Sequence, residues 1–242
     1  MTKIRIDKLV QDQFPEYSRT QIQSWIIQGA VLVDGAVITK PGITVETTAH
    51  IQITAEEPKY VSRGGLKLEK ALQEFKVDIT GKIALDSGIS TGGFTDCLLQ
   101  HGIQHVYGID VGYGQVHEKI RTDSRVTIIE RTNIRHYEPK HEPVDIITFD
   151  LSFISLLKTI STVQENLKQD GLWLPLIKPQ FEAPKGSVPR GGVIKNAASR
   201  ETILKNVIKG IEAEGFTCQG TITSPILGAT GNTEYLALFT KS

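Results

Sequence analysis

Residues 83–96 read IALDSGISTGGFTD: a short apolar run ends in Asp86, passes through a glycine-rich turn and resumes as a second apolar segment. The pattern predicts a strand, a tight turn and the start of a helix. Glycines permit positive φ angles and let the backbone approach a ligand closely, and the first turn of a helix presents unpaired N–H groups. An ordinary strand-to-helix turn without a ligand has the same pattern, so the segment alone leaves both interpretations open.

The next strand favours a bound ligand. Residues 105–109 are predicted to form it, and Asp110 stands at its end, about twenty residues beyond the turn, at the spacing expected of an acid that binds a ribose. Together the two features favour an adenosine-type cofactor, and NAD is one of the cofactors that would fit them.

The composition is that of an ordinary globular protein. Of 242 residues, 39% are hydrophobic and 22% charged, and 27 basic residues balance 27 acidic ones, so nucleic acid would have to bind at local patches. Cys97 and Cys218 are too few for a disulfide framework or a metal site, which favours a reducing compartment and no metal. Neither a signal peptide nor an apolar run of about 20 residues is present, so we expect a cytoplasmic protein that does not enter membranes.

Residues 1–54 form a first predicted unit. Two short helices, the second with Ser18 as its N-cap, precede a hairpin at Asp34 and Gly35 and a strand from Ile51. The pattern SRTQIQSWIIQGAVLVDGAVITKPG resembles the S4 RNA-binding domain, a small α+β module. The resemblance implies that the second helix and the turn before it face RNA, here through Arg5, Lys8, Ser18, Arg19, Gln21 and Gln23. A solvated helix face is the alternative for each residue, and five basic against five acidic residues predict weak RNA binding by this unit alone.

Residues 55–61 are predicted to be a linker, and residues 62–242 a second domain in which strands and helices alternate. The alternation predicts an α/β fold with a Rossmann-like, doubly wound sheet and an antiparallel terminal strand, preceded by the small α+β unit. Two strands should end at the ligand-binding edge of the sheet, one in Asp150 and the other at Lys178 and Pro179. Residues 151–160 are expected to form the next helix, and Ser199 to cap a later, long one.

Position alone leaves three further features ambiguous. Lys67 falls in the first turn of a predicted helix, where a cation opposes the helix dipole, but a solvated lysine would fit there as well. Glu234 begins the last strand, as a routine edge charge would. Segment 183–196, rich in glycine, proline and basic residues, is predicted to be a loop near the substrate entrance or a plain surface loop.

Five motifs follow the S4-like unit, in the order SRGGLKL, DSGISTGGFTD, FDLSFIS, IKPQFE and GNTEY, and together they resemble the TlyA family. Its members are haemolysins by name and S-adenosylmethionine-dependent ribosomal RNA 2′-O-methyltransferases by activity. The resemblance implies a catalytic Lys-Asp-Lys-Glu set, shared with FtsJ-like enzymes, on Lys67, Asp150, Lys178 and Glu234. It also implies a cytidine substrate in 16S rRNA, 23S rRNA or both, with ribosomal RNA or ribosomal subunits as the partner.

The implied cofactor is S-adenosylmethionine, because the catalytic set has no role in the hydride transfer that NAD would serve. The glycine turn would approach its methionine portion, Asp110 its ribose and Asn133 its adenine, while its sulfonium would lie near Asp86 and Asp150. The expected cofactor-binding residues are Asp86, Ser87, Gly88, Ser90, Thr91, Gly92, Gly93, Phe94, Asp110, Val111, Asn133 and Asp150. The RNA contacts expected in the second domain are Arg63, Lys185 and Arg190.

The catalytic set suits the chemistry. A ribose 2′-hydroxyl is a weak nucleophile, so its methylation requires positioning and removal of a proton. A lysine accepts a proton only when neutral, and lysine titrates near ~10.4 unless burial or a neighbouring cation lowers its pKa. We expect Lys178 to be the base or the hydroxyl orienter, Lys67 to support it, and Asp150 and Glu234 to fix the lysines. The alternatives are a non-catalytic RNA-binding ribosome assembly factor and, less favoured, a pore-forming haemolysin.

Overall fold

The computed structural model describes residues 3–27, 29–54, 58–184 and 186–242. The chain divides into two units, Met1–Glu57 and Pro58–Ser242.

The first unit packs two short helices against small antiparallel sheets. Its elements are β1 (Lys3–Arg5), α1 (Ile6–Gln13), α2 (Arg19–Ile27), β2 (Val31–Val33), β3 (Ala36–Ile38), β4 (Thr44–Glu46) and β5 (Ile51–Ile53). Strand β2 pairs with β3 and β5, and β1 pairs with β4. Asp34 and Gly35 both have positive φ, 49° and 82°, as a two-residue hairpin turn requires. The predicted helices and hairpin are confirmed, whereas β1 and β4 had not been predicted.

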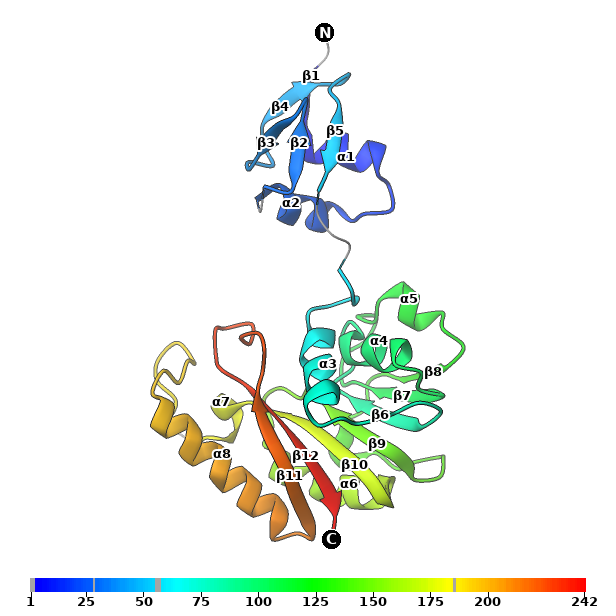
Figure 1. The fold of residues 1–242 in the computed structure, drawn as a ribbon, viewed down its shortest axis with the longest axis vertical. Coiled ribbons are helices and arrows are strands. Elements are labelled where there is room, and N and C mark those ends of the chain that lie inside the picture. Colours follow the sequence, from blue (N-terminus) through cyan, green and yellow to red (C-terminus); the bar gives the residue numbers. More distant parts are fainter. Residues whose placement is uncertain (1–2, 28, 55–57, 185) are drawn as a thin grey trace. The chain divides into compact units, whose positions relative to one another are not determined.

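The second unit is built on a seven-stranded sheet with the order β11-β12-β10-β9-β6-β7-β8 (Figure 1). The strands are β6 (Ile83–Ser87), β7 (His105–Ile109), β8 (Val126–Ile129), β9 (Val144–Phe149), β10 (Leu167–Ile177), β11 (Phe216–Thr223) and β12 (Tyr235–Lys241). Each neighbouring pair in the series β10-β9-β6-β7-β8 is parallel. Strand β12 runs antiparallel to both of its neighbours, β10 and β11. The predicted fold class is confirmed.

Alternate residues of the central strands face opposite sides of the sheet, and each side has its own core. Ala84, Ile146 and Leu174 pack with helices α3 (Gly64–Glu74) and α4 (Gly93–Gln100). The adjacent residues of the same strands, of which Leu85 and Trp173 are examples, face the other side and pack with α6 (Ile160–Asn166) and α8 (Ala197–Glu212). Helices therefore cover both faces (Figure 1), as buried parallel strands require.

The sheet also explains where a ligand would bind. Strand β6 pairs with β7 on one side and with β9 on the other. The strand order therefore reverses at β6: the chain first adds β7 and β8 toward one edge of the sheet, and then returns to add β9 on the opposite side of β6. In such sheets the crevice at the carboxyl ends of the strands, at the point of reversal, is the usual ligand site.

Two helix boundaries differ from the prediction. Residues 151–155 are not helical; they lead into the 3-10 turn η2 (Leu156–Lys158), and α6 begins only at Ile160. The N-cap of α8 is Asn196, whose side chain accepts a hydrogen bond from the Ser199 backbone N–H at 2.9 Å. The remaining short elements are α5 (Glu118–Arg121), the 3-10 turn η1 (Ile134–His136) and α7 (Pro179–Glu182).

Candidate active site

The glycine turn after β6 brings two strand ends into close contact. Gly88 has a φ of 83°, and Gly92, with a φ of 98°, precedes the start of α4 at Gly93. A Cβ atom at Gly88 would lie 2.6 Å from the carbonyl oxygen of Asp150, so only glycine fits where β6 and β9 end. The turn and Asp150 therefore form one continuous wall at the carboxyl edge of the sheet.

Two adjoining cavities open at this edge. The first, which we call the lysine cavity, has a volume of about 330 Å³, and its lining includes all four predicted catalytic residues. The second, the Asp110 cavity, has a volume of about 360 Å³. The linings share Gly88, Ser90, Asp150 and Ser152. A molecule in one cavity would therefore meet a molecule in the other at the Gly88 turn and Asp150.

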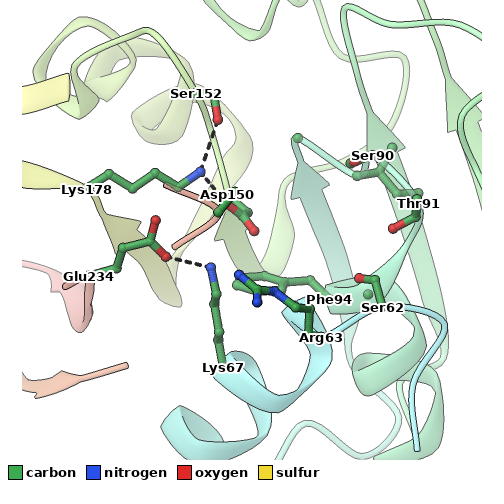
Figure 2. Close-up of a pocket in the computed structure, with 15 residues that line it drawn as sticks. Ser62, Arg63, Lys67, Ser90, Thr91, Phe94, Asp150, Ser152, Lys178 and Glu234 are labelled. Atoms are coloured by element: carbon green, nitrogen blue, oxygen red, sulfur yellow. Dashed lines mark hydrogen bonds and ion pairs between the residues drawn. The ribbon is translucent and has the colours of Figure 1, made fainter. Parts of the chain in front are cut away.

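Two ion pairs occupy the lysine cavity (Figure 2). Lys67 Nζ lies 2.6 Å from Glu234 Oε2, and Lys178 Nζ lies 2.6 Å from Asp150 Oδ1. Lys178 also donates a hydrogen bond to the Ser152 hydroxyl at 3.1 Å. The side chains of Lys67 and Glu234 are only 8% and 3% exposed, and that of Asp150 is 24% exposed. The second pair is therefore the more accessible to a substrate.

The topology of the sheet brings these four residues together. Asp150 follows the end of β9 and Lys178 the end of β10, so both lie at the carboxyl edge. Glu234 precedes β12, which runs antiparallel to β10 and therefore begins at the same edge. Lys67 lies in the first turn of α3. The structure thus brings the predicted catalytic set into one cavity from four separate elements.

The Asp110 cavity contains polar groups suited to a nucleoside. The Asp110 carboxylate accepts hydrogen bonds from the backbone N–H groups of Ser90, at 2.8 Å, and Gly112, at 2.7 Å, which fixes it at the end of β7. Val111 and Asn133 also line this cavity, and Asn133 Oδ1 caps η1 by accepting a hydrogen bond from the Arg135 backbone N–H at 3.1 Å. A carboxylate and a carboxamide at these positions fit the ribose and the adenine of an adenosine cofactor.

The expected cofactor-binding residues of the turn divide between the cavities. Ser87 lines only the Asp110 cavity, Gly88 and Ser90 line both, and three others line only the lysine cavity: Thr91, Gly93 and Phe94. Gly92 lies outside both linings as the described residues define them, because it packs on Ile120.

Asp86 also lies outside both linings and has a different place from the one expected. Its side chain is fully buried, and its two oxygens accept hydrogen bonds from the hydroxyls of Thr95, at 2.7 Å, and Thr148, at 2.8 Å. Burial raises the pKa of Asp86 to about 6, although the two hydroxyls oppose this shift. The Asp86 carboxylate therefore faces neither cavity, and it is not placed to contact a sulfonium as expected.

Sequence reasoning missed the residues of the 151–155 loop. Ser152 lines both cavities and binds Lys178, and Phe153, at 90% exposure and with a φ of 64°, lines the Asp110 cavity. Glu182 anchors the loop by accepting hydrogen bonds from the Ser155 hydroxyl, at 2.6 Å, and the Leu156 backbone N–H, at 2.9 Å. Burial raises the pKa of Glu182. The motif FDLSFIS contains the loop, but its apolar spacing indicated a helix.

The residues expected to bind RNA in the first unit are organised by one acid. The fully buried Asp7 accepts hydrogen bonds from Arg5, Arg19 and Gln23, at 2.8–3.2 Å. The Arg5 guanidinium is the main reason that the pKa of Asp7 lies well below its usual range. The side chains of Arg5 and Arg19 are still 52% and 53% exposed. Asp7 therefore holds two cations in fixed positions at the surface.

The other expected RNA contacts vary in their surroundings. Ser18 caps α2 by accepting a hydrogen bond from the Gln21 backbone N–H at 3.3 Å, and Lys8 is exposed. Arg63 lines the lysine cavity (Figure 2). Its guanidinium donates a hydrogen bond to the carbonyl oxygen of Leu227 at 2.8 Å. Arg190 is exposed in the loop between α7 and α8 and lies outside the linings of both cavities, as the described residues define them. Lys185 lies outside the described residues.

Among residues 3–27, 29–54, 58–184 and 186–242, no helix is long and apolar enough to cross a membrane. In the same part of the chain, no group of three or more His, Cys, Asp or Glu side chains is placed to hold a metal ion.

Comparison with known families gives two matches. Residues 60–241 match the FtsJ-like methyltransferase model, and residues 4–51 match the S4 domain model.

Individual relatives cover most of the chain. Hemolysin A of Brachyspira hyodysenteriae is 43% identical over 239 residues, covering 98% of this chain and 99% of that protein. The 16S/23S rRNA (cytidine-2′-O)-methyltransferase TlyA of Mycobacterium tuberculosis is 41% identical over 221 residues, covering 90% of this chain and 82% of that protein. A solved structure from Streptococcus thermophilus has a TM-score of 0.78 at 36% identity and covers 100% of this chain and 90% of that chain.

Proposed function

Since this chain belongs to the FtsJ-like methyltransferase family, with an S4 domain at its N-terminal end and S-adenosylmethionine as its methyl donor, we propose that it methylates the 2′-hydroxyl of a cytidine in ribosomal RNA. The names of the TlyA relatives support both the ribose position and the base. The substrate would be 16S rRNA, 23S rRNA or both, within ribosomal subunits, and the reaction would take place in the cytoplasm.

The observation that carries this proposal is the two ion pairs of the lysine cavity, one of which reaches the junction with the Asp110 cavity through Asp150. Lys178, held by Asp150 and Ser152, lies beside the residues that both cavities share. In the proposed mechanism Lys178 first passes its own proton to the paired Asp150, and the neutral amine then orients the ribose 2′-hydroxyl and takes its proton. Lys67 supports the same hydroxyl from α3, with Glu234 fixing it. Fixed cations around a hydroxyl that loses a proton stabilise the developing negative charge.

The Asp110 cavity fits the donor. S-adenosylmethionine supplies an electrophilic methyl group on its sulfonium. In the proposal Asp110 binds the ribose hydroxyls, Asn133 and Val111 contact the adenine, and the Gly88 turn approaches the methionine portion. Asp150 lines both cavities, so its carboxylate would be near the positive sulfonium as well as near Lys178.

In this proposal the two units have separate roles. We assign RNA binding to residues 1–54, a linker to residues 55–61 and methyl transfer to residues 62–242. The arginine pair on Asp7 supports the first assignment, because guanidinium groups held in fixed positions suit phosphate recognition. Lys8, Ser18, Gln21 and Gln23 would contribute further contacts, and Arg63, Lys185 and Arg190 would contact RNA from the second unit.

The test is transfer of a labelled methyl group to isolated small and large ribosomal subunits, followed by mapping of ribose methylation. Strands β9 and β10 provide a matched control, because they carry an Asp–Lys pair at each end: Asp145 with Lys168, at 2.6 Å, and Asp150 with Lys178, also at 2.6 Å. We expect Lys178→Met to abolish transfer and Lys168→Met to preserve it. Lack of incorporation into either subunit by the unaltered protein would refute the proposal, and full activity of Lys178→Met would refute the assigned role.

A further inference from the structure

Asn232 is a fully buried polar residue that joins two loops. It lies between β11 and β12, two positions before Glu234. Its Oδ1 accepts a hydrogen bond from the Ile194 backbone N–H at 3.0 Å, and its Nδ2 donates to the Gly192 carbonyl oxygen at 2.8 Å. Gly192 and Ile194 belong to the loop between α7 and α8. One side chain therefore joins the loop that precedes α8 to the loop that precedes β12.

Asn232 also closes the turn that leads to Glu234. Its Nδ2 donates a second hydrogen bond, to Thr230 Oγ1 at 3.0 Å, and its carbonyl oxygen accepts one from the Gly228 N–H at 2.9 Å. Gly228 packs so closely on Glu234 that a Cβ atom there would overlap the Glu234 carboxylate. The turn closed by Asn232 is therefore the wall against which Glu234 rests.

The two hydrogen bonds by which the Asn232 side chain joins the two loops, which we call the Asn232 bridge, require a carboxamide. Oδ1 must accept from one backbone group while Nδ2 donates to another, and asparagine is the side chain of this size that does both. An aspartate would have no donor for the Gly192 carbonyl, and an alanine would leave both backbone groups without their buried partner. The geometry thus identifies a specific chemical requirement rather than a general preference for a polar side chain.

We infer that Asn232 is a positioning residue that couples the loop between α7 and α8 to Glu234, and through Glu234 to Lys67. The kinetic consequence of this inference rests on the proposed function, in which Arg190 of that loop contacts acceptor RNA. When the loop engages the RNA, the bridge keeps Glu234 in place against Lys67. Without the bridge, the Glu234 carboxylate can shift, and a misplacement of about 1 Å in a catalytic group can lower the rate roughly 100-fold.

The first experiment compares Asn232→Asp with Asn166→Asp in the full-length chain. Asn166 is also fully buried and donates a hydrogen bond to the Thr162 carbonyl oxygen at 2.8 Å, but it lies at the end of α6, away from both cavities. We expect Asn232→Asp to lower the single-turnover rate of methyl transfer about 10- to 100-fold. Its affinity for S-adenosylmethionine, measured by calorimetry without RNA, should stay unchanged, and Asn166→Asp should keep the wild-type rate. A wild-type rate for Asn232→Asp, or a parallel loss of cofactor affinity, would overturn the inference.

A second pair of variants tests the bridge from the loop side without altering a buried residue. Gly192 and Gly215 have φ angles of 74° and 86°, and a Cβ atom at either would meet nothing within 4 Å among the described residues. Alanine therefore strains the backbone similarly at both positions. Gly192→Ala should lower the rate several-fold, whereas Gly215→Ala, at the end of α8, should not. Equal rates for the two variants would contradict the coupling.

Limited proteolysis supplies a result that is independent of methyl transfer. Trypsin cleavage of the Arg190–Gly191 bond, followed by mass spectrometry in the absence of RNA, reports how firmly the loop is held. We expect this bond to be cut faster in Asn232→Asp than in the wild-type protein and in Asn166→Asp. If the wild-type protein methylates neither subunit, the proposed function fails, and equal cleavage rates would separately overturn the bridge.

Discussion

Replacing Asp86 by asparagine should stabilise the protein at neutral pH. The Asp86 carboxyl is fully buried in the sheet, and burial is the main reason that its pKa rises from 3.8 to about 6. Thr95 and Thr148 offset the burial only in part, each by one hydroxyl. Asparagine has the same shape and can still bond to both hydroxyls, but it carries no charge.

The shift in pKa sets the size and sign of the effect. Unfolded chains release the Asp86 proton near pH 3.8 and folded molecules near pH 6, so the folded state binds more protons between these values. The free energy of unfolding therefore falls as the pH rises through this window. About two pKa units correspond to about 3 kcal/mol, which is the cost of the buried charge above pH 6. After some loss of hydrogen-bond strength, we expect Asp86→Asn to gain about 2 kcal/mol at pH 7.5, or roughly 4–8 °C in Tm.

The assay is thermal and urea unfolding of the full chain from pH 4 to pH 7.5. The advantage of Asp86→Asn should shrink toward zero as the pH falls to 4. Asp78→Asn is a control with the opposite sign, because the Thr80 backbone N–H donates to the exposed Asp78 and lowers its pKa. That variant should be less stable than the wild-type protein throughout this range, and its deficit should shrink only below pH 3.8, because the lowered pKa of Asp78 places its titration there. An Asp86→Asn protein less stable than wild type at pH 7.5, or an advantage independent of pH, would refute the reasoning.

Three other substitutions test separate parts of the structure. Gly88→Ala would place a Cβ atom 2.6 Å from the Asp150 carbonyl oxygen at a φ of 83°, so calorimetry should show more than about a tenfold loss of S-adenosylmethionine affinity. Lys67→Met leaves the buried Glu234 without its cation and should lower the free energy of unfolding in urea by about 3–5 kcal/mol. The double variant Lys67→Met/Glu234→Leu should regain most of this stability, and equal stability of the single and double variants would contradict the reasoning. Asp7→Asn should speed hydrogen exchange in residues 3–53 at pH 7. Because the folded pKa of Asp7 is lowered, the wild-type advantage should disappear as the pH falls below the usual carboxyl range, and an advantage that persists there would argue against the ion pairs.

The strand ends were the part of the site that the sequence could predict. Apolar runs that stop at Asp110, Asp150 and Lys178 indicate buried parallel strands, and right-handed crossovers bring the ends of such strands to one edge. Lys67 and Glu234 could be included only by family resemblance. Glu234 reaches the edge because β12 is reversed with respect to β10, and apolar spacing does not reveal the direction of a strand.

The loop after β9 shows why the remaining site residues could not be predicted. The segment LSFISLLKTI has helical apolar spacing, yet residues 151–155 form a loop. Glu182, 26 residues after Leu156 in sequence, accepts a hydrogen bond from the Leu156 backbone N–H, which a helix would otherwise satisfy internally, and a second one from the Ser155 hydroxyl. A contact over this sequence distance leaves no periodic pattern. The loop brings Ser152 to Lys178, so the missed helix boundary and the missed site residue have the same cause.

Register explains why two acids with similar sequence patterns have opposite surroundings. Asp86 and Asp150 each follow an apolar run, and both were expected beside the cofactor. In the sheet Asp86 is level with Thr148, so Asp150 lies two residues farther along β9, about 6–7 Å nearer the carboxyl edge. Asp86 is the last residue but one of β6 and is enclosed by hydroxyls, whereas Asp150 has passed the end of β9 and reaches Lys178. An offset of two residues between neighbouring strands thus places Asp86 inside the protein, where its charge is destabilising, and Asp150 at the edge of the sheet, where a substrate can reach it.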